Sequence, residues 1–171
     1  MDIKARLLKN YSMATLKRIV EHAQQDQDSF GKLMAIFLGA PYRLMQRATV
    51  PVELCVKKNP QLISRHLPQL IKLLSTKSTS DSMKRNLLRT LQYIDIPPNY
   101  CSKVLDICFA ALTNANSPIA VRVFSMTVAA NICSNFPEIK KELVSIITDR
   151  MPYESAGFVS RGKKILKRLA T

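Results

Sequence analysis

Apolar residues recur along this chain at the spacing of an amphipathic helix, and the same pattern returns at a longer interval. Counted from Pro60, Pro98 and Pro137, an apolar residue stands 2, 7, 10 and 14 positions further on in each case. These offsets place the apolar residues on one face of a helix with about 3.6 residues per turn. Proline suits the first turn of such a helix, because its missing N–H would find no partner there. The pattern therefore predicts three helices, each opened by one of these prolines.

A series of arginines has nearly the same period. Arg47, Arg85, Arg122 and Arg161 follow one another at intervals of 38, 37 and 39 residues, and each stands early in a second helix-like segment. A fixed period of a few tens of residues is typical of a repeat array, in which each unit buries its apolar face against its neighbours. We therefore expect two helices in each repeat, joined by short turns.

Polar residues mark where several of these helices should begin. A side-chain oxygen just before a helix can accept a hydrogen bond from the unpaired N–H groups of the first turn. Residues 2–9 and 12–25 precede the first repeat and are expected to form one or two further helices. The expected N-cap residues of the repeats are Asp28 or Ser29, Ser80, Ser117 and Ser155.

The segment SPIAVRVFSMTVAANI, residues 117–132, resembles a HEAT repeat. Tetratricopeptide repeats fit less well, because their period is shorter and they need a tryptophan that this chain lacks. Together, resemblance and period predict an all-α fold, an α-solenoid of about four HEAT-like (armadillo-type) helical pairs wound into a right-handed superhelix. We expect a single domain over residues 1–171. It would consist of an N-terminal helical cap, 1–25, and repeats over about 26–59, 60–96, 97–136 and 137–171.

Most of the chain also resembles a family of small bacterial HEAT-like proteins, common in the Bacteroidetes, that often carry the name adenylosuccinate lyase. The matching residues lie in RATVPVELCVKKNPQLISRHLPQLIKLL, ICFAALTN, SPIAVRVFSMTVA, PEIKKELVSII and YESAGFVSRGKKIL. That name would imply a flexible active-site loop with a Gly-Ser start, then Met-Pro, Lys and Asn-Pro. The nearest stretch, residues 80–86, lacks the glycine and both prolines. We therefore expect it to be the capped start of a helix, and the chain not to be an enzyme.

Other catalytic patterns are missing as well. His22 and His66 have no cysteine, serine or carboxylate at a helical spacing that would form a triad or a metal site. Gly157 and Gly162 lie in one helical segment, without the strand that a phosphate-binding loop requires. HEAT-like alkylpurine DNA glycosylases use tryptophans in their lesion pocket, and this chain has none. We expect no catalytic residue, no metal and no cofactor.

The cysteines point to a compartment rather than to chemistry. None of them has a neighbour at the two- or three-residue spacing of zinc ligands. We expect small buried thiols in a reducing cytoplasm. The longest apolar runs are a few residues, so we expect no membrane span. The cysteines are Cys55, Cys101, Cys108 and Cys133.

Charge is the feature that bears most directly on function. The net charge is +14, and cations are densest in the last helical segment, which has no acidic residue. In a solenoid of helical pairs the second helices usually line the concave face, where cations would attract a polyanion. The structural alternative is that the four periodic arginines bond neighbouring helix ends. The candidate binding residues are Arg43, Arg47, Lys84, Arg85, Arg89, Arg122, Arg161, Lys163, Lys164, Lys167 and Arg168.

These observations favour a non-enzymatic binding or scaffold module that recognises an acidic protein segment on a basic helical surface. The alternative is sequence-independent binding of DNA or RNA on the same surface. Aromatic residues make up only 6% of the chain, so platforms for stacking bases are scarce. Adenylosuccinate lyase activity, a third reading, rests on the family name alone. We expect a monomer that does not associate with membranes.

Overall fold

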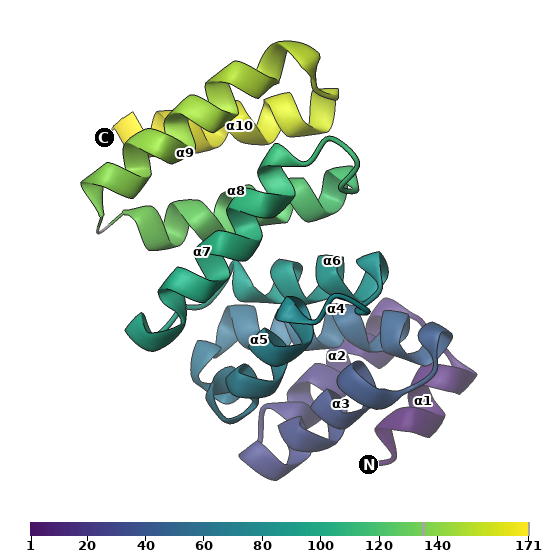
Figure 1. Ribbon diagram of the computed structural model, residues 1–171. Helices are drawn as coiled ribbons and strands as arrows, with labels where there is room; N and C mark the ends of the chain where they lie inside the picture. Colours follow the sequence, from purple (N-terminus) through teal and green to yellow (C-terminus); the bar gives the residue numbers. More distant parts are fainter. Residues whose placement is uncertain (135, 171) are drawn as a thin grey trace. The chain divides into compact units, whose positions relative to one another are not determined.

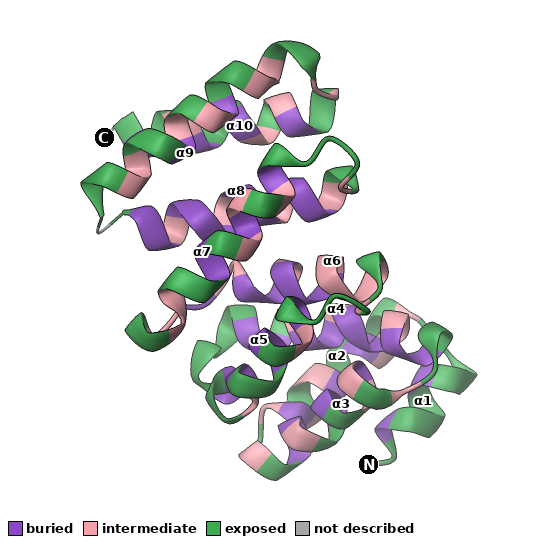
Figure 2. Ribbon diagram, viewed as in Figure 1, coloured by how far each residue is buried: buried purple, intermediate pink, exposed green. Residues whose placement is uncertain are grey.

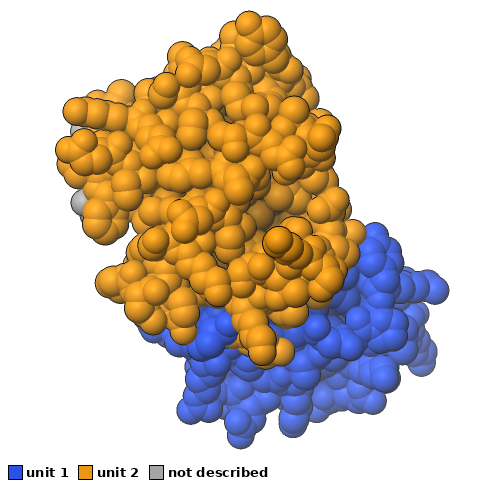
Figure 3. Space-filling view, in the orientation of Figure 1, with its two compact units in different colours: residues 1–68 blue, residues 69–171 orange. Residues whose placement is uncertain are grey.

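The computed structural model describes residues 1–134 and 136–170, and within them the chain consists of helices joined by short connections (Figure 1). No strand occurs in these two ranges, which confirms the predicted all-α class. The helices divide between two compact units, unit 1 over residues 1–68 and unit 2 over residues 69–171 (Figure 3). Each unit has its own buried core.

Unit 1 is built around a long helix pair. Helices α3 and α4 pack against each other, and α2 packs against both of them. The three large side chains Phe30, Leu33 and Phe37 on α3 are completely buried, as the period-3.6 pattern predicts. The elements of this unit are α1 (Ile3–Lys9), α2 (Met13–Ala23), α3 (Gln27–Gly39), α4 (Tyr42–Lys58) and the 3₁₀ helix η1 (Pro60–His66).

Unit 2 is organised around α8, which packs against α6, α7, α9 and α10. Because neighbours surround α8, buried residues occur around much of its circumference (Figure 2). A helix that is apolar on most sides is typical of the centre of a helical domain. Helix α5 (Leu67–Ser75) crosses the boundary between the units. The other elements are α6 (Asp81–Leu91), α7 (Pro98–Thr113), α8 (Ile119–Cys133), α9 (Pro137–Arg150), η2 (Met151–Tyr153) and α10 (Ala156–Ala170).

The proline pattern locates two helices correctly and one only in part. Helices α7 and α9 begin at Pro98 and Pro137, as predicted. Pro60 instead opens the 3₁₀ helix η1, and α-helical winding starts at Leu67. Pro68 explains the difference, because it has no N–H to donate to the carbonyl of Ser64 four residues earlier. The predicted single helix is therefore two shorter ones.

The predicted N-caps are also confirmed at some helices and wrong at others. Ser80 accepts a hydrogen bond from the N–H of Met83, and Ser155 accepts one from Phe158. At α3, however, the cap is Asp26, whose Oδ1 lies 2.6 Å from the backbone nitrogen of Ser29. That bond lowers the pKa of the Asp26 carboxyl. Ser117 is not a cap either, because α8 follows Pro118 and has no side-chain cap.

Close packing of α9 on α10 depends on Gly162. A Cβ at this position would lie 3.0 Å from Cγ2 of Ile147 and 3.2 Å from Sδ of Met151. At Gly157, one and a half turns earlier, the nearest atom would be Oγ of Ser155 at 3.9 Å. The same helix therefore contains one crowded and one open glycine.

We predict opposite effects for alanine at the two glycines. Gly157→Ala should raise the free energy of unfolding by up to about 1 kcal/mol, because alanine favours the helix. Gly162→Ala should be less stable than Gly157→Ala by about 1–3 kcal/mol, because the added methyl group overpacks the contact between α9 and α10. Denaturant unfolding followed by circular dichroism measures both variants. Equal stability of the two variants would contradict this prediction and show that the contact between α9 and α10 can accommodate the added methyl group.

Three of the four thiols are buried, as predicted, and the fourth is half-buried. Desolvation raises the pKa of Cys55 and of Cys108 to about 12, and that of Cys133 to about 11. Cys101 is the half-buried one, and its Sγ lies 3.3 Å from the carbonyl oxygen of Ile96. A buried thiol of high pKa is a poor nucleophile, because only the thiolate reacts.

We therefore predict that a disulfide reagent at about pH 8 titrates Cys101 first in the folded protein. All four thiols should react once the chain is unfolded in guanidinium. The variant Cys101→Ser should lose the early reaction and keep the late one. Rapid reaction of that variant would mean that a buried thiol becomes accessible in the native state.

Candidate interaction surface

Helix α10 presents the densest group of exposed cations that the sequence predicts. Its residues Phe158, Gly162, Ile165 and Leu169 are buried, and they recur every three or four positions. The opposite side is exposed, and no residue of the helix is acidic. We call this exposed side the basic face of α10. Its cations are Lys163, Lys164, Lys167 and Arg168.

Arg161 belongs to the same helix but lies half-buried at its contact with α8. Its Nη1 donates to Oγ1 of Thr127 at 2.6 Å and lies 3.4 Å from Oε1 of Gln92. Thr127 is on α8, and Gln92 directly follows α6. The guanidinium of Arg161 therefore connects α10 to two other helices of unit 2.

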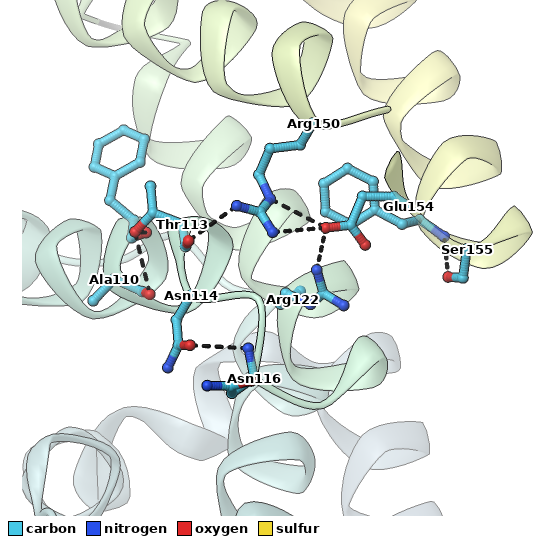
Figure 4. Close-up of polar contacts among 10 residues, drawn as sticks. Ala110, Thr113, Asn114, Asn116, Arg122, Arg150, Glu154 and Ser155 are labelled. Carbon is cyan, nitrogen blue, oxygen red and sulfur yellow. Dashed lines mark hydrogen bonds and ion pairs between the residues drawn. The ribbon is translucent and has the colours of Figure 1, made fainter. Parts of the chain in front are cut away.

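Arg122 is buried and takes part in an ion-pair network. Its Nη1 is bonded to Oε1 of Glu154 (Figure 4). Its guanidinium carbon lies 5.7 Å from the ring centre of Phe158. The side chain of Glu154 is 4% exposed, and the same carboxylate oxygen accepts bonds from Nε and Nη2 of Arg150 at 3.1 and 3.0 Å. Nη1 of Arg150 donates to the carbonyl of Thr113 at the end of α7. One carboxylate thus links α8, α9 and the start of α10, and through Arg150 it also fixes the end of α7.

Arg47 performs a comparable role in unit 1. Its Nη1 donates to the carbonyl oxygens of Leu7 and Leu8 at 2.6 and 3.1 Å, and its guanidinium carbon lies 5.4 Å from the ring centre of Tyr11. The last carbonyls of a helix lack partners within the helix, and a cation there also interacts favourably with the helix dipole. Arg47 therefore completes the carboxyl end of α1.

Bonds of this kind join residues about one repeat apart. In each case a side chain donates to the backbone carbonyl of a residue earlier in the chain. The two residues are 40 apart for Arg47 and Leu7, 39 apart for Asn131 and Gln92, and 37 apart for Arg150 and Thr113. Each accepting carbonyl lies at the carboxyl end of a helix or directly after it. At Arg47, Arg122 and Arg161, the structural interpretation of the periodic arginines therefore agrees with the bonds that these side chains make.

The remaining predicted cations are spread over two helices. Arg43 is exposed in the first turn of α4, in unit 1. Lys84, Arg85 and Arg89 on α6, in unit 2, are half-buried. The Nε of Arg85 lies 3.3 Å from Oδ1 of its neighbour Asn86. Lys84 borders a cavity of about 350 Å³ between the start of α6 and the loop that joins α7 to α8.

The ion-pair network contains two residues that sequence reasoning did not single out, Arg150 and Glu154. A weak signal exists, because Glu154 is the last acidic residue of the chain and stands just before a helix. Its buried partner, however, is 32 residues earlier, and nothing in the local sequence indicates that distance.

Among residues 1–134 and 136–170, no group of three or more His, Cys, Asp or Glu side chains is placed to hold a metal ion. Within the same ranges, no helix is both long and apolar enough to cross a bilayer.

We predict that Glu154→Gln lowers the free energy of unfolding by about 3–5 kcal/mol, because it leaves the buried guanidinium of Arg122 without a counter-charge. Denaturant unfolding followed by circular dichroism measures this loss. The matched control is Glu142→Gln, which neutralises an exposed carboxylate on α9 and should change stability by less than about 0.5 kcal/mol. A similar small loss for Glu154→Gln would contradict a structural role for the network.

Comparison with known proteins agrees with the repeat pattern. A family model described as HEAT repeat domain matches residues 3–169, which is nearly the whole chain. Comparisons with curated proteins and with solved structures gave no significant match. The match includes the helices that carry the ion-pair network and the basic face of α10. The chain therefore belongs to the HEAT repeat domain family.

Proposed function

We propose that this protein is a non-enzymatic interaction module that holds an acidic protein segment against the basic face of α10. HEAT repeat domains generally mediate protein interactions and generally carry no catalytic activity. The chain adds a strong positive charge, +14 in all, to that general role. A partner rich in Asp and Glu is the protein ligand that such a surface favours.

The observation that carries the proposal is the run of exposed cations on α10, a helix without an acidic residue. Lys163, Lys164, Lys167 and Arg168 lie within two turns of one another, so a short segment with spaced carboxylates can meet several of them at once. Long flexible side chains at an exposed surface suit a ligand that is itself flexible. Such contacts chiefly raise the association rate and weaken with salt.

The predicted cations outside the basic face of α10 divide into framework residues and candidates for secondary contacts. Arg47, Arg122 and Arg161 already bond groups of the protein itself, so a ligand would have to displace those bonds. We therefore assign them to the framework rather than to ligand contact. The exposed Arg43 and the half-buried Lys84 and Arg89 of α6 stay candidates for secondary contacts. Arg85 already bonds its neighbour Asn86, so it joins the framework residues.

Several finer features are also part of the proposal. We place the protein in the cytoplasm, because a reducing compartment suits buried free thiols, and we expect it to act as a monomer. Binding of DNA or RNA is the competing outcome for the basic face. Residues 80–86, the stretch nearest to the lyase loop signature, form the capped start of α6, which supports a structural role for them.

We predict that reversing the charge of the basic face weakens binding of a fluorescein-labelled peptide of about 20 alternating Glu and Ser residues by at least tenfold. The variant is Lys163→Glu, Lys164→Glu and Lys167→Glu. Each exposed ion pair contributes about 0.2–1 kcal/mol, and the variant replaces three attractions with three repulsions. Fluorescence anisotropy at near-physiological salt measures the affinity.

The matched control reverses three exposed lysines on other helices of unit 2, Lys72, Lys103 and Lys141. It changes the net charge equally, so it should leave most of the affinity in place if the basic face is specific. Equal losses in both variants would mean that only net charge matters. Tighter binding of a duplex DNA of equal charge, abolished by the α10 variant, would favour the nucleic-acid function instead.

A further inference from the structure

A second surface feature lies in unit 1, where α2 and α4 form a groove of about 600 Å³. Its apolar floor consists of Met13 and Val20 from α2 and Leu54 from α4, and the small side chain of Ala14 leaves space beside them. Met13 is 72% exposed and Leu54 is 36% exposed. Most large apolar residues of this unit are buried, so two exposed ones in one depression require an explanation.

The rim of this groove is basic. Lys17 from α2 and Lys57 and Lys58 from α4 line it, and no acidic residue does. Glu21 and Glu53 are on the same two helices but outside the lining. The two helices lie side by side here, with Sγ of Cys55 placed 3.9 Å from the carbonyl oxygen of Val20. Lys17 and the pair Lys57 and Lys58, which stand about one repeat apart in the sequence, thus border one depression.

We infer that this groove is a second docking site, for an acidic amphipathic helix that inserts one or two large apolar side chains between the lysines. The lining residues of α2 run from Met13 to Val20, which corresponds to about 10 Å of helix, or two turns. A partner helix fits that length with anchors at positions i and i+3 or i+4. Methionine adapts its shape to an inserted side chain more easily than a branched residue does.

The positive charge of the rim favours an acidic amphipathic helix as the ligand of this groove. An apolar anchor flanked by carboxylates places each anion near a rim lysine while the anchor covers Met13 and Leu54. A partner with basic flanks would be repelled, and a purely acidic chain would leave the floor exposed to water. The inference rests on the proposed function in one respect, because the partner is again an acidic protein segment. Beyond the proposed function, the inference requires apolar anchors in the partner and a binding site separate from α10.

Two labelled peptides of equal charge test the inference by fluorescence anisotropy. One is a helix-forming acidic peptide with two leucines four residues apart, and the other has alanine in place of both leucines. The groove variant is Met13→Ser with Leu54→Ser, and its matched control is Leu8→Ser, since Leu8 is 50% exposed elsewhere in the same unit. A second groove variant, Lys17→Glu with Lys58→Glu, is compared with Lys4→Glu and Lys32→Glu, which change exposed lysines outside the groove.

The leucine peptide should bind the natural protein at least about tenfold more tightly than the alanine peptide, the gain expected from burying a leucine side chain. Both groove variants should remove that difference, and both controls should keep it. Reversing the charge of the basic face of α10 should weaken the alanine peptide and leave the leucine-dependent gain. The proposal for the groove and the proposal for the basic face of α10 can therefore be contradicted independently of each other.

A direct readout locates the contact. In protein labelled with ¹³C in its methionine methyl groups, the Met13 signal, assigned through Met13→Leu, should shift with the leucine peptide and not with the alanine peptide. Equal affinity of the two peptides, or a leucine-dependent gain that survives in the groove variants, would overturn the inference. A Met13 signal that responds only to duplex DNA or to anionic lipid vesicles would overturn it as well.

Discussion

The carboxylate of Glu154 is the interaction on which the packing of unit 2 depends most. It is almost completely buried and accepts bonds from two guanidinium groups, those of Arg122 and Arg150. Burying a charge is unfavourable unless it is paired and hydrogen-bonded, so these side chains hold one another in a single arrangement. The arrangement fixes where α9 ends and α10 begins. The apolar residues of α10 then pack inward, and its lysines lie on the opposite, exposed side.

Features that depend on a single helix could be predicted from the sequence. The apolar stripe identifies the buried side of α7, and Pro98 identifies its start, because both follow from helix geometry and from the missing N–H of proline. The same reasoning failed at Pro60, where Pro68 interrupts the winding. It also misplaced the cap of α3, because Asp26, Asp28 and Ser29 are all able to cap a helix and only the backbone path selects Asp26.

Features that depend on contacts between helices could be anticipated only as alternatives. The period of the arginines indicates that they share a structural position, but it does not show whether that position faces a ligand or a neighbouring helix. The bonds of Arg47 to α1 and of Arg161 to α8 show a neighbouring helix. The apolar floor at Met13 and Leu54 was not predicted at all. Residues on two helices form it, and neither helix alone reveals the depression.

The central place of α8 also has a consequence for the order in which the native protein opens. Backbone amides exchange their hydrogens with solvent when a segment unfolds locally, and segments with few buried contacts open at the lowest free energy. Helix α1 buries only Ile3 and Leu7, so its amides can exchange through fraying of the amino terminus. Helix α8 is packed against four other helices and cannot open without disturbing each of them. Its amides therefore report the global unfolding of unit 2 and should be the last of that unit to exchange.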